Sequence, residues 1–409
     1  MALRDVTRIL IVLTDRCNLN CAYCYQTATK SRSIPWEAVR AGIDFALKGS
    51  SPEIDLIFSG GEPLLDFDRL REAVVYADAA RPPGKRVQYR ISTNGLLLSQ
   101  EIAGFLQEHE FTVQLSFDGI AAAQDCRAPG TFQILDQMLD SLRAGHPDLF
   151  ARGLRVSMVV TPLTVNHMAE SVAHFLRKDV RNIIIAPVIG HQEGWEAGKI
   201  TELDAQIGAI AETCLRHLER TGEVPVRIFG KTRAQNREEG HKRRLCGGLR
   251  GTSLVVDADG QVLGCPLFSE SCKDIRAGSP LSAVNTLLMG DIREPGLSER
   301  RAAACEAARL LLPPGWEERR HSSYGRCRDC EYFDGCSICP VSIVNDAQEP
   351  GTFRVPDFIC AFNQAVFKQR ERFHHASGKG LSRPRDSDPI APLEAWLRAI
   401  RAQRARDRT

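Results

Sequence analysis

Short apolar segments alternate with amphipathic ones from residue 8 to about residue 222, and this alternation restricts the fold most. The apolar segments, rich in Ile, Val, Leu or Phe as buried parallel strands are, lie at 8–14, 54–59, 87–93, 111–118, 154–161 and 182–188. Helical patterns lie at 36–48, 68–80, 99–109, 132–144, 166–178 and 201–221. Six βα units in a row predict an α/β fold with a parallel sheet covered by helices. Because a closed barrel of this kind has eight units, we expect an open, partial (β/α)6 barrel with its active site at the carboxyl ends of the strands.

Composition excludes several classes of protein. Of the 409 residues, 43% are hydrophobic and 25% are charged, which is typical of a folded chain and not of a disordered one. The 53 Lys and Arg against 51 Asp and Glu give a net charge of +2, so no overall basic field favours nucleic acid. No apolar run is long enough to cross a membrane, and residues 1–8 carry no apolar signal segment. We therefore expect a cytoplasmic protein that binds neither nucleic acid nor membranes, in a compartment that disfavours disulfides.

The fourteen cysteines are clustered rather than scattered. Three fall within eight residues, at Cys17, Cys21 and Cys24, and nine lie between Cys246 and Cys360. Cys126 and Cys214 stand apart, and we interpret both as buried or inert thiols. In a reducing compartment, clustered cysteines are typical of metal ligands.

The first three cysteines have the spacing C-x3-C-x2-C, in a loop directly after the first predicted strand. Three thiolates on one tight loop can hold three irons of a 4Fe-4S cluster and leave the fourth iron without a protein ligand. Zinc is the competing metal, but structural zinc normally has four protein ligands, and no fourth Cys or His lies nearby in the sequence. Free buried cysteines are a third interpretation, which spacing alone leaves open.

This loop resembles the cluster loop of the radical S-adenosylmethionine (SAM) enzymes, whose hallmark is C-x3-C-x-aromatic-C, and Tyr23 fills the aromatic position. Taken singly, a Gly-Gly-Glu segment is an ordinary loop and Asn-Gly an ordinary turn. Here, within residues 8–220, the second, third and fourth predicted strands end in motifs similar to those of the family: Gly60-Gly61-Glu62-Pro63, Ser92-Thr93-Asn94-Gly95 and Ser116-Phe117-Asp118-Gly119. The last of these, and the segment Asp125-x-Arg127-x2-Gly130-Thr131-Phe132 after it, resemble the peptide-modifying branch.

The resemblance implies a reaction type. SAM binds the open iron through its amino and carboxylate groups, and one electron splits it into methionine and a 5′-deoxyadenosyl radical, which abstracts a hydrogen atom from an unactivated C–H bond. Glycines let the backbone approach a ligand closely, and Glu62 can pair with the SAM ammonium. The residues expected to bind SAM are Tyr23, Gly60, Gly61, Glu62, Pro63, Ser92, Asn94, Ser116 and Asp118.

The later cysteines form a second pattern. It reads Cys246-x13-Gly260-x4-Cys265, then Cys327-x2-Cys330-x5-Cys336-x2-Cys339, with Cys360 after twenty intervening residues. Cys-x2-Cys pairs alone are compatible with a zinc ribbon. Taken together with the N-terminal cysteine triplet, the pattern resembles the SPASM domain, a cysteine-rich iron–sulfur appendage of radical SAM enzymes. The resemblance implies two auxiliary 4Fe-4S clusters, with Cys327, Cys330, Cys336 and Cys360 at the distal one and Cys246, Cys265 and Cys339 at the one nearer the barrel.

Three departures from the SPASM pattern matter. Two residues instead of three separate Cys336 from Cys339, which weakens the assignment of Cys339. The nearer cluster lacks an obvious fourth ligand; Cys272, Cys305 or Cys214 could supply it, or an iron could stay open for a substrate thiol or amide. Sulfatase-maturating members of the family carry an Asp that acts as a base at the position of Pro266. Because proline cannot accept a proton, the sequence makes a sulfatase-maturating activity less favoured.

We divide the chain into a radical SAM partial barrel (1–225), a linker (226–245), a SPASM auxiliary-cluster domain (246–365) and a basic C-terminal tail (366–409). The third part begins with a predicted hairpin at 252–256 and 261–263 and is otherwise poor in apolar patterning, so we expect bound metal to stabilise it. The tail holds eleven Lys and Arg against five Asp and Glu. We interpret it as solvated, with a linker at 377–392 and a short basic helix at 393–405; an arm that docks an acidic partner is the alternative.

His191 and Glu193 follow the sixth predicted strand, where a proton acceptor would face the barrel mouth, and they are the candidate catalytic residues. Exposed loop residues are the plainer interpretation of both. For Tyr324, which precedes the cysteine run, we expect a packing role.

The sequence therefore predicts a radical SAM/SPASM oxidoreductase that modifies a peptide or protein side chain, with a thioether or carbon–carbon crosslink or an oxidised residue as product, as in the maturation of ribosomal peptides. The expected partners are that peptide or protein and an electron donor such as flavodoxin or ferredoxin. Because the first strand begins near residue 1, we expect no leader-binding domain before it, so a separate leader-peptide-binding protein or the basic tail would recruit a peptide. The alternatives are a small-molecule substrate, such as an aminosugar or tetrapyrrole precursor, and a non-enzymatic redox or zinc-binding regulator.

Overall fold

A computed structural model gives the structure of the chain. It describes residues 5–26, 31–189, 195, 197–230, 246–272, 287–312, 315–336, 338–340, 343 and 353–378. In these residues no helix is both long and apolar enough to cross a membrane.

Six parallel strands form the centre of the molecule, in the order β6-β5-β4-β3-β2-β1, so each strand pairs with its sequence neighbours. Alternate side chains along them are buried in one large apolar cluster. This confirms the open (β/α)6 arrangement expected from the apolar segments. The strands are β1 (Arg8–Thr14), β2 (Glu53–Gly60), β3 (Arg86–Thr93), β4 (Thr112–Ser116), β5 (Leu154–Val160) and β6 (Ile183–Pro187).

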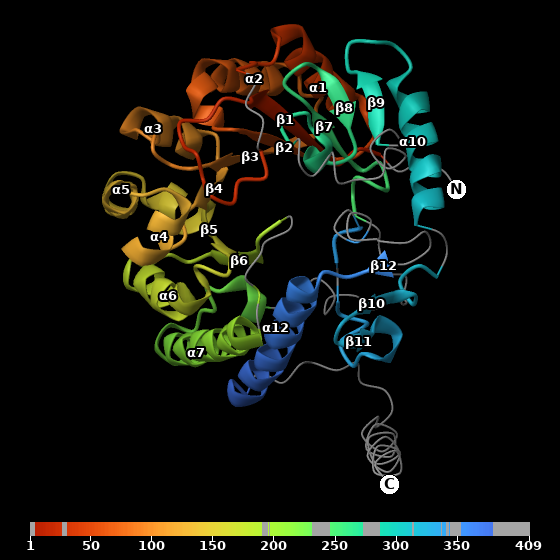
Figure 1. Cartoon of the computed structure of the whole chain (residues 1–409). Coiled ribbons are helices and arrows are strands. Elements are labelled where there is room, and N and C mark those ends of the chain that lie inside the picture. The colour runs from red at the N-terminus through yellow and green to blue at the C-terminus, as the bar shows by residue number, and fades with distance from the viewer. Residues whose placement is uncertain are drawn as a thin grey trace.

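Helices cover the outer side of the curved sheet, and the chain runs around it in sequence order (Figure 1). Each helix buries one apolar stripe against the strands, as in α5, where Leu135, Met138, Leu139 and Leu142 are buried. The helices are α1 (Trp36–Lys48), α2 (Phe67–Ala80), α3 (Gln100–Glu108), α4 (Ala121–Arg127), α5 (Phe132–Gly145), α6 (Met168–Arg177) and α7 (Ala197–Thr221).

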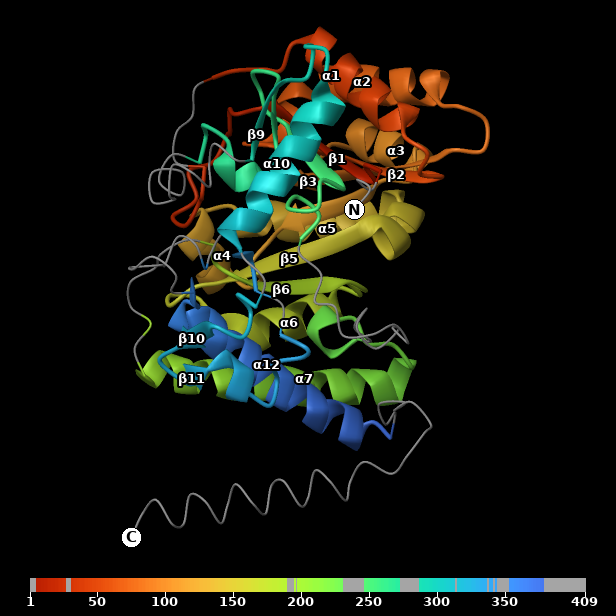
Figure 2. The ribbon, with the colours of Figure 1, turned by 90° about the vertical axis from the view of Figure 1, so that its right-hand side faces the viewer.

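The sheet continues beyond β1 into the cysteine-rich part of the chain. Strand β7 (Ser253–Val256) pairs in parallel with β1, and β8 (Gln261–Leu263) and β9 (Leu288–Asp291) follow antiparallel, which gives nine strands. The predicted hairpin is thus confirmed as β7–β8. Helix α10 (Leu297–Leu311) packs beside β9 (Figure 2). Backbone pairing therefore ties the region after residue 246 to the first strand of the barrel.

The last described element differs from the expected tail. A small sheet of β10 (Arg320–Ser322), β11 (Gly325–Arg326) and β12 (Phe353–Arg354) leads into α12 (Asp357–Ala376), which lies along α7 in both views (Figures 1 and 2). Residues 366–376, which the charge count assigned to a solvated tail, are thus the second half of a packed helix. The predicted basic helix at 393–405, and the predicted linker after residue 378, lie outside the described residues.

We expect Phe373→Ala to lower the free energy of unfolding by about 3–5 kcal/mol, because truncating a buried Phe leaves a cavity. Phe373 is 2% exposed, and its ring stacks on Phe229 with centroids 5.1 Å apart. The matched control is His375→Ala, two residues along the same helix and exposed, which should change stability by less than about 0.5 kcal/mol. Equal denaturation curves for the two variants would show that this end of α12 is not packed.

Candidate functional site

The first cysteine loop leaves the carboxyl end of β1 and is closed at its base by a buried ion pair. Asp15, 1% exposed, accepts from Arg32 Nε at 2.8 Å and from the Arg32 backbone N–H at 2.6 Å. Arg32 also reaches Asp259 at 3.1 Å and Glu270 at 3.5 Å, both after β7. Since Asp15 and Arg32 bracket the three cysteines, this contact fixes where the loop starts and ends.

The three thiols of the loop lie close enough to influence one another. Burial raises the pKa of Cys17, and the nearby Cys24 thiol raises it further. Burial also raises the pKa of Cys21; Arg127 opposes this, and Cys24 and Cys17 add to it. Within the described residues, no three His, Cys, Asp or Glu side chains already form a metal-binding group. The donor set still fits iron, because three thiols on one short loop are the ligands that an iron–sulfur cluster takes.

Gly60 and Gly61 bring the end of β2 against the backbone of this loop. Gly61 N donates to Thr14 O at 2.9 Å, and Glu62 N donates to Arg16 O at 2.8 Å. A Cβ at Gly60 would lie 2.2 Å from Thr14 O, and one at Gly61 would lie 2.3 Å from Arg16 O. Glycine is therefore required here for two backbones to touch, before any ligand is considered.

Glu62 is fully buried, and its carboxylate accepts three hydrogen bonds from backbone and side-chain donors. Its carboxylate accepts from Leu64 N at 3.0 Å, Thr93 Oγ1 at 2.7 Å and Asn94 N at 2.7 Å. Burial raises its pKa, and these hydrogen bonds act in the opposite direction. In the structure the Glu62 carboxylate fixes Thr93 and Asn94. Its expected role as partner of the SAM ammonium stays a prediction.

Asn94 connects this carboxylate to the cysteine loop. Its Nδ2 donates to Asn18 Oδ1 at 2.7 Å and lies 3.9 Å from Cys17 Sγ. Asn18 was not among the predicted site residues, because a single Asn within a loop carries no pattern of its own.

A second buried ion pair holds the other side of the loop. Arg127 donates to both carboxylate oxygens of Asp118, at 2.8 and 3.1 Å, and Val159 N donates to the same carboxylate at 2.9 Å. The Tyr23 hydroxyl also donates to Asp118, while the Arg127 guanidinium lies 5.2 Å from the centre of the Tyr23 ring. Asp118 and Tyr23, both expected to bind SAM, therefore contact each other.

The remaining predicted SAM residues lie at the same edge of the sheet. Pro63, buried, begins the helical turn η1 (Pro63–Asp66) after β2. Ser92 on β3 pairs with Gln114, and Ser116 ends β4 beside Ser157. The candidate catalytic residues His191 and Glu193 lie outside the described residues.

The later cysteines form two groups. Burial raises the pKa of Cys265 to about 12, and Cys339, Cys246 and Cys272 all lie near enough to add to this. Burial likewise raises the pKa of Cys336 to about 11, and its neighbours are Cys327, Cys360 and Cys330, with Arg320 in opposition. The neighbours of Cys265 and those of Cys336 thus come from the two sets that the sequence pattern separated, with Cys272 added to the first. Cys265, Cys327, Cys336 and Cys360 nevertheless pack against one apolar cluster, and their roles as metal ligands stay predictions.

Polar donors point at the sulfurs of the second group. Ser322 Oγ lies 3.2 Å and Gln364 Nε2 3.3 Å from Cys360 Sγ, and Asn363 Nδ2 lies 3.6 Å from Cys336 Sγ. Donors of this kind stabilise a thiolate and orient it as a ligand. This donor set therefore fits a thiolate-bound metal centre.

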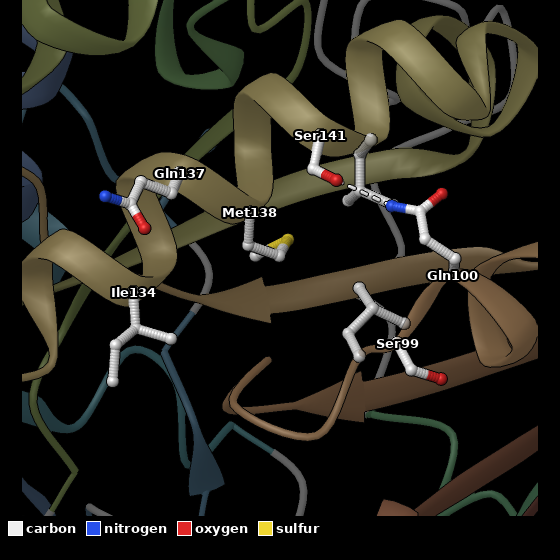
Figure 3. A pocket seen from close by; sticks show the side chains of 8 residues that line it. Ser99, Gln100, Ile134, Gln137, Met138 and Ser141 are labelled. Carbon is white, nitrogen blue, oxygen red and sulfur yellow. Dashed lines mark hydrogen bonds between the residues drawn. The ribbon is translucent and has the colours of Figure 1, made fainter.

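A hollow on the helical side of the barrel is unrelated to these groups. It lies between the start of α3 and the face of α5, where Gln100 Nε2 donates to Ser141 Oγ at 2.6 Å (Figure 3). The residues that line it carry no acid, base or thiol, so it offers no group for the chemistry expected of the cysteine loop.

Comparisons with known proteins agree with this arrangement. Residues 11–176 match the family model described as the Radical SAM superfamily. Relatives include an uncharacterized protein of Methanocaldococcus jannaschii (28% identical, 43% of this chain and 60% of that one) and GTP 3′,8-cyclase of Mycolicibacterium smegmatis (27% identical, 67% and 77%). The cysteine-type anaerobic sulfatase-maturating enzyme of Clostridium perfringens is 25% identical over 40% of this chain and 47% of its own length. This chain thus covers less than two thirds of the first and third of these relatives.

The solved structure of anSMEcpe with bound AdoMet and Kp18Cys peptide has the same fold, with a TM-score of 0.68 and 17% identity over 90% of this chain and 97% of that one. The shared fold includes the cysteine-rich part after residue 246 as well as the barrel. Together with the family match, it identifies residues 11–176 of this chain as a radical SAM domain.

Proposed function

We propose that this radical SAM enzyme oxidatively modifies a side chain of a peptide or protein, as a thioether or carbon–carbon crosslink or an oxidised residue. The observation that carries the proposal is the extent of the shared fold, which covers 97% of anSMEcpe, a protein solved with bound AdoMet and a peptide. The substrate would reach the carboxyl edge of β1–β6, where the cysteine loop lies. We place the activity in the cytoplasm, where the thiols stay reduced.

Cys17, Cys21 and Cys24 would hold the 4Fe-4S cluster that binds SAM. When bound, the cluster supplies the electron that cleaves SAM to methionine and the 5′-deoxyadenosyl radical. The chain's own residues act by position: Gly60 and Gly61 allow the close backbone approach, and Glu62 keeps Thr93 and Asn94 at the ligand edge. Tyr23, Asp118 and Arg127 anchor the far side of the loop.

The cysteine-rich part would hold two auxiliary 4Fe-4S clusters as a SPASM domain (246–365), joined to the barrel (1–225) through 226–245. An auxiliary cluster would accept the electron that the substrate radical gives up. His191 or Glu193 would accept the proton, since Pro266 has no acid–base group. A flavodoxin or ferredoxin would deliver electrons, and a separate leader-binding protein or the basic end of the chain would recruit a ribosomal peptide.

A small-molecule substrate is the second candidate. The observation in its favour is the relative GTP 3′,8-cyclase, whose similarity covers 67% of this chain and 77% of that protein. A tetrapyrrole precursor or an aminosugar would belong to the same class.

We expect the wild-type protein, reconstituted anaerobically with iron and sulfide, to form 5′-deoxyadenosine from SAM and dithionite, as measured by liquid chromatography. Cys24→Ala should abolish product, because two thiolates cannot hold the cluster with one open corner. Cys126→Ala is the matched control; its thiol donates within its own helix to Ala122 O at 3.3 Å, and product should persist. Wild-type protein that forms none would contradict the proposal.

Asp118→Asn should lower the free energy of unfolding by about 3–5 kcal/mol, because Arg127 is then left as a buried charge without its partner. Iron content and SAM cleavage should fall with it, since the Tyr23 side of the loop is released. Asp68→Asn, on the exposed face of α2, is the control and should match wild type in all three measurements. An unchanged Asp118→Asn variant would show that the ion pair does not anchor the loop.

Co-expression with peptides encoded beside the gene tests the substrate class. A peptide substrate should lose two mass units per crosslink or oxidised residue in the presence of wild-type enzyme and stay unchanged with Cys24→Ala. A peptide that keeps its mass, together with SAM cleavage stimulated by a small molecule, would favour the second candidate.

A further inference from the structure

A group of arginines lies on the inner face of the barrel sheet, toward the amino ends of its strands. The helices cover the outer side (Figure 1), and alternate strand residues are buried against them, so the residues between these lie on the inner face. Arg90 on β3 pairs across the sheet with Thr112 on β4. Arg155 on β5 pairs with Gln114, two residues further along β4. Arg90 and Arg155 therefore share the inner face, with one strand between them.

Asp55 on β2 is the carboxylate that interacts with this group, and both of its oxygens are already occupied. Its Oδ1 accepts from Arg90 Nε at 3.0 Å and from Arg90 Nη2 at 2.8 Å. Its Oδ2 accepts from Arg8 Nε at 3.3 Å and from Arg8 Nη2 at 3.2 Å. Two guanidinium groups therefore share one negative charge, and each oxygen of Asp55 already accepts two hydrogen bonds.

Arg155 adds a third guanidinium to this face. In the part of the chain that the structure describes, its Nε is buried and has no hydrogen-bond partner. Burial lowers the pKa of Arg155, the charges of Arg90 and Arg227 lower it further, and Asp55 acts in the opposite direction. A buried N–H without an acceptor costs free energy, so an oxyanion placed here would gain a donor that is otherwise unused.

Arg227 extends the group beyond β6. Ile183 N at the start of β6 donates to Pro225 O at 2.9 Å, two residues before Arg227. Ile183 in turn pairs with Val156, the residue after Arg155. The segment that carries Arg227 thus lies beside the amino end of β6, and this residue is exposed, which leaves its charge available to a ligand.

The strand that carries Arg155 also leads to the cysteine loop. Val159, four residues after Arg155 on the same face of β5, donates its backbone N–H to Asp118 beside that loop. Four residues of a β-strand span about 13 Å. An extended peptide segment of about four residues is therefore long enough to reach from the loop to the arginines.

We propose that Arg90, Arg155 and Arg227 form an oxyanion subsite on the inner face of the barrel, which takes an acidic group of the substrate. Guanidinium groups bind carboxylate and phosphate through paired N–H donors, and the positive charge here exceeds the single charge of Asp55. The inference rests on the proposed function, because a peptide substrate supplies the acidic group. The recognised feature is then an acidic side chain or terminal carboxylate about four residues from the modified residue.

Inorganic phosphate is the probe for the subsite, titrated by isothermal calorimetry into the full-length, anaerobically reconstituted protein at constant ionic strength. Wild type should bind it saturably, and Arg155→Gln should bind it about tenfold to a hundredfold more weakly, because charge-assisted hydrogen bonds are lost. Arg152→Gln is the matched control and should bind as wild type does; this guanidinium, three residues earlier, is 76% exposed and pairs with Asp148. No saturable binding by wild type, or equal binding by Arg155→Gln, would overturn the proposal.

Thermal unfolding distinguishes a binding role from a structural one. In buffer without phosphate, Arg155→Gln should not lower the unfolding midpoint, because the side chain that it removes lies among like charges. Phosphate should raise the midpoint of wild type and not that of the variant. If Arg155→Gln instead unfolds early or fails to fold, Arg227→Gln, at an exposed position, decides the question. Undiminished phosphate binding by Arg227→Gln would then overturn the subsite.

Co-expression with neighbouring peptides tests the source of the acidic group. The ratio of modified peptide to 5′-deoxyadenosine should fall in Arg155→Gln, because a poorly held substrate uncouples SAM cleavage from its modification. Replacing acidic residues of the peptide by their amides should cause the same loss with wild-type enzyme. An unchanged ratio in both experiments would show that the substrate does not use the subsite. Wild-type protein that forms no 5′-deoxyadenosine would instead overturn the proposed function, which the phosphate titration does not test.

Discussion

Two backbones that touch without a side chain between them determine the site. Gly60 and Gly61 lie against Thr14 and Arg16 so closely that a Cβ at either glycine would overlap a carbonyl oxygen. This contact joins the ends of β1 and β2, and it sets the cysteine loop beside the ends of the next strands. Glu62, the next residue, accepts hydrogen bonds from Thr93 and Asn94 and so links the end of β2 to the end of β3. The loop is therefore held by the sheet, before any metal binds.

Buried charge completes the anchoring. Asp15 with Arg32 and Asp118 with Arg127 lie on either side of the three thiols, and each carboxylate is about 1% exposed. A carboxylate in such a place is tolerated because a guanidinium and backbone donors satisfy its oxygens. Burial raises the pKa of the Cys21 thiol, and Arg127 acts in the opposite direction while its partner Asp118 adds to the rise. The two ion pairs therefore serve mainly to anchor the loop.

The sequence predicts most of the strands and helices of the barrel and part of the candidate site. Apolar spacing places all six strands and their helices within a few residues, since buried strands and amphipathic helices have local periods. Cysteine spacing predicts which thiols should bind metal, and that stays a prediction. It does not predict the contacts of Asn18 with Asn94 or of Arg32 with Asp259, which are 76 and 227 residues apart. The expected solvated tail is wrong for residues 366–376, because net charge does not report the buried stripe of Val366, Gln369 and Phe373 at helical spacing on α12.

The same long-range contacts explain how two cysteine-rich parts can work as one enzyme. Strand β7 pairs with β1, Arg32 reaches Asp259, and Tyr25 of the first loop packs on the apolar cluster around Cys265. Electron transfer between centres depends on a fixed separation, which a linker alone would not provide. Sheet pairing and side-chain packing fix the described cysteine-rich residues against the barrel, as the proposed electron transfer requires. The cysteine-rich part is thus joined through β7 to residues 8–11 of β1, the strand from which the first loop begins.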